Sequence, residues 1–578
     1  MINGAMRTTL VAMTAMMYAG CDSKKHPPSP SSAPAPTSDA SASPAHPLTD
    51  VTHESGIDFI HDKHETGEFR FPELNGAGVG VLDYDNDGWY DLYFAQGGAL
   101  PGVPGGKLLS DQLYRNRGEG TFENVTRRAG IDATGYGMAV VCGDYDNDGD
   151  TDIFVGNVGP NQFLRNNGDG TFTDVTKDLK LGDPRWALGG AFFDYDGDGW
   201  LDLFVSNYAI WDPSNEKHCT IRDSAQRDYC GPSVHQGDRD ILYRNDGQGG
   251  FVDVSEQTGI AKLTGTGMGV VCADFTGDGL PDIYVANDAE PNRLWVQQAD
   301  HTFVDEAGAR FCDLNAEGKA ESSMGIVAED FDGNGSRDVL QTHFYSESNT
   351  LYMNQGDVFR DHTRITNLRS TTMPFTSFGI SVIDLRNDGG MQLFIANGKV
   401  NMASKVEYQK DAPYAERNQV LEWSYDRRRF DDVTDAMGPA MESTAVSRGT
   451  ATLDYDNDGD LDIVVANNNG PAQLLRNNAP ASNHWLTVRC IGPDGKRDAL
   501  GAVVEIETGS TIRRRLVYAS SSYASSSAPL PHFGLGNRAT VDRLTVHWPD
   551  GRRSTWRNLP TNRTWTAHHN DPTAETVN

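Results

Sequence analysis

The chain has 578 residues, which is too long for one ordinary hydrophobic core, so two or more folded units are expected. Its formal net charge of -32 argues against nucleic acid as a partner and favours cation binding or plain solubility. Beyond the N-terminus, no apolar run approaches the roughly 20 residues that a membrane span requires.

Residues 1–20 are predicted to be a signal peptide of the lipoprotein type. Arg7 precedes a short apolar stretch from Leu10 to Met17, which is typical of a secretory signal. The ending Ala19-Gly20-Cys21 resembles the bacterial lipobox, so Cys21 is the predicted lipidation site and the chain a membrane-anchored lipoprotein of the cell envelope. Tyr18 departs from the usual Leu of that motif, which leaves a secreted protein as the alternative.

Residues 21–47 are rich in Pro, Ser and Ala. Such a composition cannot bury a core, so this stretch is predicted to be a disordered linker that tethers the folded part.

Seven copies of an Asp-rich loop with the pattern D-x-D-x-D-G-x-x-D follow the linker; they begin at Asp83, Asp144, Asp194, Asp274, Asp330, Asp384 and Asp454. A Gly stands five positions before six of the loops, and short apolar segments flank each loop. Continuous apolar segments indicate strands that are buried on both faces. In several copies Asn-Gly or Asp-Gly pairs then predict a hairpin of two outer strands.

Each repeat therefore predicts one four-stranded blade, and residues 48–479 are predicted to form a seven-bladed β-propeller in an all-β protein. The last repeat stops at Asn478 without its fourth strand. The first folded segment, Leu48 to Thr52, has the sequence of that missing strand. We expect it to pair into the last blade and close the ring.

The side chains at positions 1, 3, 5 and 9 of each loop are the predicted metal ligands, with Gly at position 6 permitting the turn. In copies one, two, three and seven they are all aspartates: Asp83, Asp85, Asp87, Asp91, Asp144, Asp146, Asp148, Asp152, Asp194, Asp196, Asp198, Asp202, Asp454, Asp456, Asp458 and Asp462. Copies four and five add neutral oxygens: Asp274, Thr276, Asp278, Asp282, Asp330, Asp332, Asn334 and Asp338.

Oxygen ligands without His or Cys favour Ca²⁺, and Mg²⁺ prefers fewer protein carboxylates. The sequence therefore predicts about six structural Ca²⁺ sites. The sixth copy has Arg386 at position 3, a fixed positive charge where a cation would sit, so no metal is expected there. EF-hands are excluded because position 12 is never Glu.

A competing interpretation is that the loops are Asp-rich turns held by side-chain hydrogen bonds alone. Electrostatics weighs against it, because two carboxylates about 5 Å apart repel by roughly 3 kcal/mol at an effective dielectric of 20. Four converging carboxylates contain six such pairs, and a cation removes that cost.

The repeat unit resembles the FG-GAP/VCBS repeat of integrin α-subunit propellers, whose loops hold Ca²⁺. After it come Asn483-His484-Trp485-Leu486, Arg497 to Ala502, Ser521-Ser522-Tyr523, His532 to Gly536 and Val546 to Gly551. These motifs are similar to the ASPIC/UnbV domain, and the combination resembles bacterial relatives of cartilage acidic protein. The resemblance implies a calcium-binding cell-surface or secreted protein and supplies no catalytic residues.

Alternating apolar segments with Gly-rich turns also predict a small β-sandwich over residues 480–568, followed by a disordered tail at 569–578. Within it the basic run Arg513-Arg514-Arg515 and the pair Arg552-Arg553 are interpreted either as a contact with anions or the acidic propeller, or as a solvated strand face.

Two long insertions are the candidate recognition loops, from Ala209 to Asp240 and from Val400 to Tyr425. The first carries Cys219 and Cys230, and an exported protein makes a disulfide between them plausible. The favoured function is recognition of an extracellular protein or glycan by a non-enzymatic propeller.

The alternative is a propeller enzyme that acts on extracellular polysaccharide. Its candidate residues are His53, His61 and His64 near Glu65 and Glu73, a group that is more often structural. No nucleophile elbow or phosphate loop is present.

Overall fold

The computed structural model describes residues 46–221, 225–402 and 412–577. The predicted signal peptide, the lipidation site Cys21 and the linker as far as Ala45 lie outside the described residues. From His46 onward the chain forms one compact unit.

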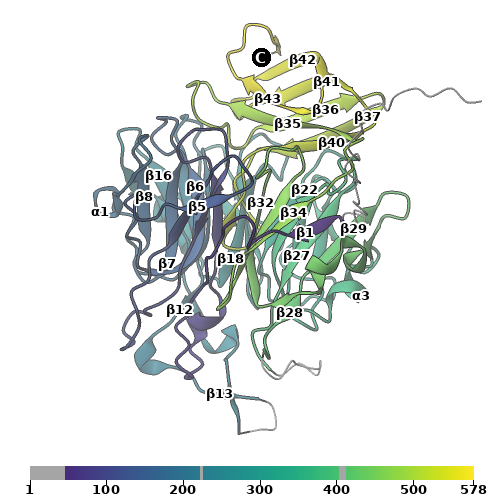
Figure 1. Cartoon of the computed structure of the whole chain (residues 1–578). Helices are drawn as coiled ribbons and strands as arrows, with labels where there is room; N and C mark the ends of the chain where they lie inside the picture. Colours follow the sequence, from purple (N-terminus) through teal and green to yellow (C-terminus); the bar gives the residue numbers. More distant parts are fainter. Residues whose placement is uncertain (1–45, 222–224, 403–411, 578) are drawn as a thin grey trace, which may run out of the picture. The chain divides into compact units, whose positions relative to one another are not determined.

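Seven antiparallel four-stranded blades make up the propeller (Figure 1). Blades one to three contain β2 (Val79–Leu82), β3 (Asp91–Phe94), β4 (Gln112–Asn116) and β5 (Phe122–Asn124); β6 (Tyr136–Gly143), β7 (Asp152–Val158), β8 (Gln162–Asn166) and β9 (Phe172–Asp174); and β10 (Ala187–Phe193), β11 (Asp202–Asn207), β16 (Ile241–Asn245) and β17 (Phe251–Asp253).

Blades four to six contain β18 (Gly267–Ala273), β19 (Asp282–Asn287), β20 (Arg293–Gln297) and β21 (Phe303–Asp305); β22 (Ile326–Glu329), β23 (Asp338–Gln341), β24 (Thr350–Asn354) and β25 (Phe359–Asp361); and β26 (Ser377–Ile383), β27 (Gln392–Asn397), β29 (Gln419–Ser424) and β30 (Arg429–Asp432). The second strand of each blade is fully buried, as its continuous apolar sequence predicts.

The seventh blade is completed by the N-terminal strand, which confirms the predicted closure. It contains β32 (Ser447–Leu453), β33 (Asp462–Asn467), β34 (Gln473–Asn477) and β1 (Leu48–Asp50). Leu48 pairs with Asn477, and Val51 N donates to Leu474 O at 2.9 Å. Because this strand supplies the free edge of the last blade with a partner, the ring has no open seam.

The Gly before six of the Asp loops is explained by the close approach of neighbouring inner strands. A Cβ at Gly325 would lie 2.1 Å from Phe378 O of the next blade, and one at Gly189 would lie 2.0 Å from Met268 O. Gly78, Gly269, Gly379 and Gly449 meet the equivalent carbonyl of their next blade. Larger residues there would push the blades apart.

In the part of the chain that the structure describes, helices are few and short. They are α1 (Thr176–Leu179), α2 (Ser255–Thr258), α3 (Leu368–Thr372) and the 3-10 turns η1 (Phe71–Leu74), η2 (Pro213–Asn215), η3 (Pro232–Val234), η4 (Ile260–Lys262), η5 (Thr434–Met437) and η6 (Pro439–Glu442). Within the described residues, no helix has the length and apolar character to cross a bilayer.

Two sheets follow the propeller and share one hydrophobic core, which makes them a small sandwich. One contains β40 (His532–Gly536), β35 (His484–Ile491) and β43 (Arg563–His568); the other contains β37 (Thr511–Leu516), β36 (Val503–Thr508), β41 (Thr540–His547), β42 (Arg553–Pro560) and β44 (Glu575–Val577). The structure corrects the prediction of a disordered tail, because residues 569–577 contain a strand. Strand β44 pairs with β42, and Trp556 Nε1 donates to Asp571 at 3.2 Å, because β42 otherwise presents an unpaired edge.

A segment of the C-terminal sandwich enters the ring. We call residues 520–527 the channel segment; it contains β38 (Ser520–Ser521) and β39 (Ser525–Ser526), which extend the sheet of blade one. Ser522 N donates to Ile326 O at 2.7 Å, and Val140 N donates to Ala524 O at 3.0 Å. Apart from Tyr523, whose hydroxyl donates to Asn75 O at 2.9 Å, the segment has only the small side chains of Ser and Ala, which fit between the closely spaced inner strands.

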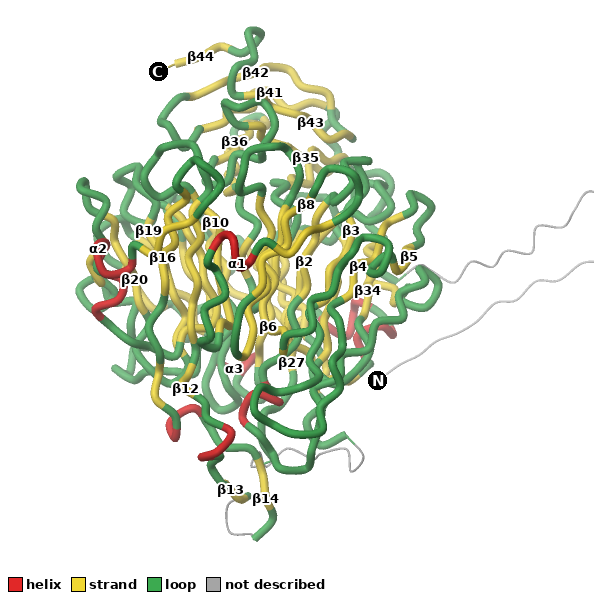
Figure 2. The backbone as a smooth tube through the Cα atoms, turned by 90° about the vertical axis from the view of Figure 1, so that its left-hand side faces the viewer, coloured by secondary structure: helices red, strands yellow, loops and turns green. Residues whose placement is uncertain are grey.

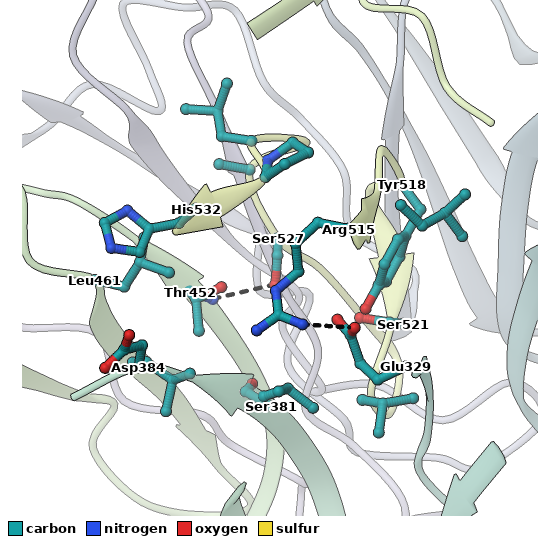
Figure 3. Close-up of a pocket in the computed structure, with 17 residues that line it drawn as sticks. Glu329, Ser381, Asp384, Thr452, Leu461, Arg515, Tyr518, Ser521, Ser527 and His532 are labelled. Atoms are coloured by element: carbon teal, nitrogen blue, oxygen red, sulfur yellow. Dashed lines mark hydrogen bonds and ion pairs between the residues drawn. The ribbon is translucent and has the colours of Figure 1, made fainter. Parts of the chain in front are cut away.

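An ion pair and a hydrogen bond also connect the C-terminal part of the chain to the ring (Figure 3). Arg515 pairs with Glu329 at 2.9 Å, and Thr452 N donates to Ser527 Oγ at 3.1 Å. Arg514 pairs with Glu505 of its own sandwich at 2.7 Å. The basic run is thus used inside the molecule, with Arg515 contacting the acidic propeller.

Neighbouring blades are connected by a hydrogen bond from an amide side chain at the end of the third strand. Asn166 Nδ2 donates to Tyr84 O of the preceding blade at 2.8 Å. The same bond is made by Asn116, Asn245, Gln297 and Asn354. Asn477 is the exception among them, since its buried side-chain atoms have no hydrogen-bond partner among the described residues.

Replacing Asn166 by Ala should lower the melting temperature, because it leaves the Tyr84 carbonyl without its donor at a cost of about 1–3 kcal/mol. Asn477→Ala is the matched control and should cost less, because no such bond is lost. Thermal unfolding followed by near-UV circular dichroism measures both. Equal losses of melting temperature in the two variants would show that this hydrogen bond between blades contributes nothing to stability.

Candidate functional site

The Asp loops bring carboxylates together at one end of the ring. In five loops the side chains at positions 1, 3 and 9 offer oxygens that lie within 4.8 Å of one another: Asp83, Asp85 and Asp91; Asp144, Asp146 and Asp152; Asp194, Asp196 and Asp202; Asp330, Asp332 and Asp338; Asp454, Asp456 and Asp462. In the fourth loop Thr276 occupies position 3 between Asp274 and Asp282.

Backbone hydrogen bonds hold positions 1 and 9 in place. In the first loop Asp83 accepts Asp87 N and Gly88 N, both at 3.0 Å. Asp91 accepts Tyr84 N at 3.0 Å and Asn116 N of the third strand at 2.7 Å. The ninth residue thus ties the loop to two strands, and its equivalents repeat this pair of bonds in five other blades.

The position 3 aspartate behaves differently. In each of the four all-Asp loops one of its oxygens is buried and has no hydrogen-bond partner among the described residues: Asp85 Oδ1, Asp146 Oδ1, Asp196 Oδ1 and Asp456 Oδ1. A buried carboxylate oxygen without a partner is costly unless a cation ligates it. These donor sets therefore fit a hard metal ion.

Burial makes the loop carboxyls resist ionisation. It raises the pKa of Asp83 to about 6, of Asp144 to about 7 and of Asp454 to about 8. Neighbouring aspartates add to the shift, as Asp458 and Asp456 do at Asp454. A bound cation would reverse this effect.

The position 5 side chains lie outside these groups. Asp87 accepts Trp89 N at 3.0 Å and pairs with Arg115 at 2.7 Å. Asn334 accepts Ser336 N at 2.7 Å. Position 5 therefore shapes the turn in this structure, whereas the sequence grouped it with the converging ligands.

The sixth loop uses its side chains for other contacts. Arg386 pairs with Asp388 at 2.9 Å and with Glu422. Gln392 accepts Leu385 N at 2.9 Å, the bond that position 9 aspartates make elsewhere. His532 Nε2 donates to Asn387 Oδ1 at 2.7 Å, so this loop contacts the C-terminal sandwich.

The two predicted insertions lie at the opposite end of the ring from the sandwich, where Figures 1 and 2 show their strands. They contain β12 (Ala209–Ile210) with β15 (Gln236–Gly237), β13 (Cys219–Thr220) with β14 (Arg227–Asp228), and β28 (Glu416–Arg417), which pairs with β31 (Thr444–Ala445). The Cys219–Cys230 disulfide is confirmed, with a Cα–Cα distance of 5.2 Å. It indicates an exported protein.

Asp228 joins the two insertions. Its carboxylate accepts Met402 N at 2.6 Å and Tyr414 Oη–H at 3.0 Å. The rings of Tyr229 and Tyr414 are 5.6 Å apart. Sequence spacing gave no sign of this contact, because the partners are separated by more than 170 residues.

The histidines considered for an enzyme do not assemble. Among the described residues, the groups tight enough to hold an ion are Asp loops, and His53, His61 and His64 belong to none of them. His61 is buried, its Nδ1 accepts Asn469 N at 3.1 Å, and burial lowers its pKa to about 3. It is a neutral, structural histidine.

Comparison with known proteins matches both parts of the chain. Residues 83–155, 144–205, 233–285 and 274–341 match the FG-GAP-like repeat, and residues 492–574 match the family described as ASPIC and UnbV. Among solved structures, an Agrocybe aegerita lectin that recognises non-reducing terminal N-acetylglucosamine is 17% identical, with a TM-score of 0.32 over 68% of this chain and 86% of that chain. BBS1N in complex with ARL6DN is 9% identical, with a TM-score of 0.37 over 74% and 97%.

Cartilage acidic protein 1 of Homo sapiens is 25% identical over 305 residues, which cover 52% of this chain and 43% of that protein. The protein of Mus musculus is 27% identical over 309 residues, 52% of this chain and 44% of the relative. The match thus spans less than half the length of these relatives. The chain therefore contains FG-GAP-like repeats and an ASPIC/UnbV domain and is homologous to cartilage acidic protein 1.

Proposed function

We propose that this protein is an exported propeller whose Asp loops bind Ca²⁺ and whose opposite end recognises an extracellular protein or glycan. The observation that carries the calcium assignment is the buried, partnerless oxygen at position 3 of all four all-Asp loops. An oxygen-only donor set with several carboxylates suits Ca²⁺ better than Mg²⁺ or a transition metal.

Calcium has a structural role in this account. Asp91 and its equivalents connect each loop to the second and third strands, so an ion there would fix the corner of every blade that binds one. An ion that binds only the folded chain adds about 2.7 kcal/mol per site at a hundredfold excess over Kd.

Recognition is assigned to the end that carries the two insertions. The disulfide closes the first insertion, and the contacts of Asp228 join it to the second. Loops on a rigid scaffold are where binding residues concentrate. Lipidation of Cys21, which would anchor the protein to a membrane, stays a prediction from the sequence.

Asp454→Asn should reduce the rise in melting temperature that Ca²⁺ causes, because it removes a charged ligand. Asp384→Asn is the matched control: both carboxylates accept the backbone N–H groups of positions 5 and 6 of their loops. The control should keep the full calcium-dependent rise. Differential scanning calorimetry with Ca²⁺ and with chelator measures it, and an equal effect of both variants would contradict the assignment.

The metal-free protein should become less stable as pH rises from about 4 to about 8. Folding raises the pKa of loop carboxyls such as Asp144, to about 7, and Asp454, to about 8, above the unfolded value of about 4. In that window the folded chain binds more protons than the unfolded chain, so the free energy of unfolding falls with pH.

Saturating Ca²⁺ should abolish this fall, since the ion replaces the protons. Melting temperatures between pH 5 and pH 8, measured in chelator and in Ca²⁺, give the comparison. Parallel curves in the two conditions would exclude metal binding by these carboxyls.

A glycan and extracellular-protein array probed with the calcium-loaded protein tests the recognition role. Binding should weaken when Cys219 and Cys230 are both replaced by Ser, because the insertion loses its covalent closure. Turnover of a bound polysaccharide would favour an enzyme instead.

A further inference from the structure

A pocket of about 310 Å³ opens at the insertion-bearing end of the ring, and we call it the end pocket. Residues that line it come from four distant parts of the chain: Lys63, Glu73, Tyr229, Tyr414, Arg448 and Asn468. Its volume lies at the lower limit for small-molecule sites, about 300–1,000 Å³, which suits one sugar ring or a molecule of similar size.

Arg448 is a cation where the fold otherwise places an apolar residue. The residues before the inner glycines of other blades are all buried and apolar: Ala77, Leu188, Met268, Met324 and Phe378. Arg448 is 0% exposed, and the blade packing alone would favour an apolar side chain there. A buried charge in an apolar position indicates a functional constraint.

Among the described residues, Arg448 makes no hydrogen bond to a carboxylate. Its guanidinium donates to backbone carbonyls: to Leu74 O at 2.7 Å, Ser447 O at 2.9 Å and Gly398 O at 3.0 Å. Its plane lies over the Phe378 ring, 3.8 Å from the centroid. Carbonyl dipoles satisfy the donors without cancelling the positive charge.

A second cation faces the same pocket. Lys63 Nζ is 3.0 Å from Tyr229 Oη, and Tyr229 Oη donates to Glu73 at 2.9 Å. The Lys63 ammonium lies 5.3 Å from the centroid of the Tyr229 ring and 5.9 Å from that of Tyr414. Lys63 also pairs with the half-exposed Glu65 at 3.8 Å. Burial lowers the pKa of Lys63, whereas the carboxylates of Glu65 and Glu73 raise it.

Asn468 supplies an acceptor that has no partner. Its Nδ2 donates to Glu73 O at 2.8 Å, whereas its Oδ1 is buried without a hydrogen bond among the described residues. The side chain is 4% exposed and lines the end pocket. A ligand with a hydroxyl group would donate to this oxygen.

We infer that the end pocket binds a single acidic sugar residue, a hexuronate, with its carboxylate beside Lys63 and Arg448 and a ring hydroxyl on Asn468. This rests on the proposed recognition of glycans at this end. The lining holds three cations, Lys63, Lys399 and Arg448, against two carboxyl groups, Glu65 and Glu73, so its charge balance favours an anion. The free acceptor selects hydroxyl groups, and the tyrosine rings offer surfaces for the ring carbons. A simple inorganic anion would leave the acceptor unsatisfied and most of the volume unfilled.

Isothermal titration of the calcium-loaded, full-length chain with glucuronate and galacturonate tests the inference. Glucose is the matched neutral sugar, and inorganic phosphate is the matched anion without a ring. The unaltered protein should bind at least one uronate about tenfold or more tightly than glucose, because the charge-assisted contacts are lost with glucose. Selective binding of phosphate over both uronates would overturn the sugar assignment.

Lys63→Met should weaken uronate binding about tenfold or more, whereas Lys177→Met, an exposed control in α1, should leave it unchanged. The melting temperature checks that each variant is folded. Uronate binding that survives Lys63→Met unchanged, or no heat for either uronate up to about 10 mM with the unaltered protein, overturns the inference. Array binding that persists in Lys63→Met would then leave the proposed recognition intact and place it elsewhere on this end.

Discussion

The buried carboxylate at position 9 of the Asp loop is the constraint on which the propeller depends. In Asp91 one oxygen accepts the loop backbone and the other accepts the third strand, so a single side chain fixes three elements of a blade. The same residue stands beside two further carboxylates, whose repulsion opposes that order. Architecture and charge are therefore coupled in the five loops that gather three aspartates, and the proposed cation would offset the repulsion there.

Much of the architecture was predictable because it repeats. Seven copies of one pattern predicted seven blades, and the missing fourth strand of the last copy predicted the pairing of Leu48 with Asn477. The disulfide was predictable because two cysteines share one insertion. The glycine before each loop was visible in the sequence, although its cause, the approach of the next inner strand, needed the structure.

Features that depend on contacts between distant segments were not predictable. The channel segment consists of Ser and Ala apart from Tyr523 and has no strand-like pattern, and its place is decided by hydrogen bonds to inner strands of distant blades. Strand β44 forms because β42 offers an edge, which no local pattern reveals. Arg448 carried a signal that was missed: it is the charged member of a series that is apolar in neighbouring blades.

The two ends of the ring have different chemistry. The Asp loops lie at one end, where the sixth loop contacts the C-terminal sandwich. The other carries the insertions and the end pocket. Anomalous diffraction from crystals grown with a calcium-mimicking lanthanide tests the account most directly. We expect peaks in the four all-Asp loops and none at Asp384; an absence of peaks at Asp85, Asp146, Asp196 and Asp456 would contradict it.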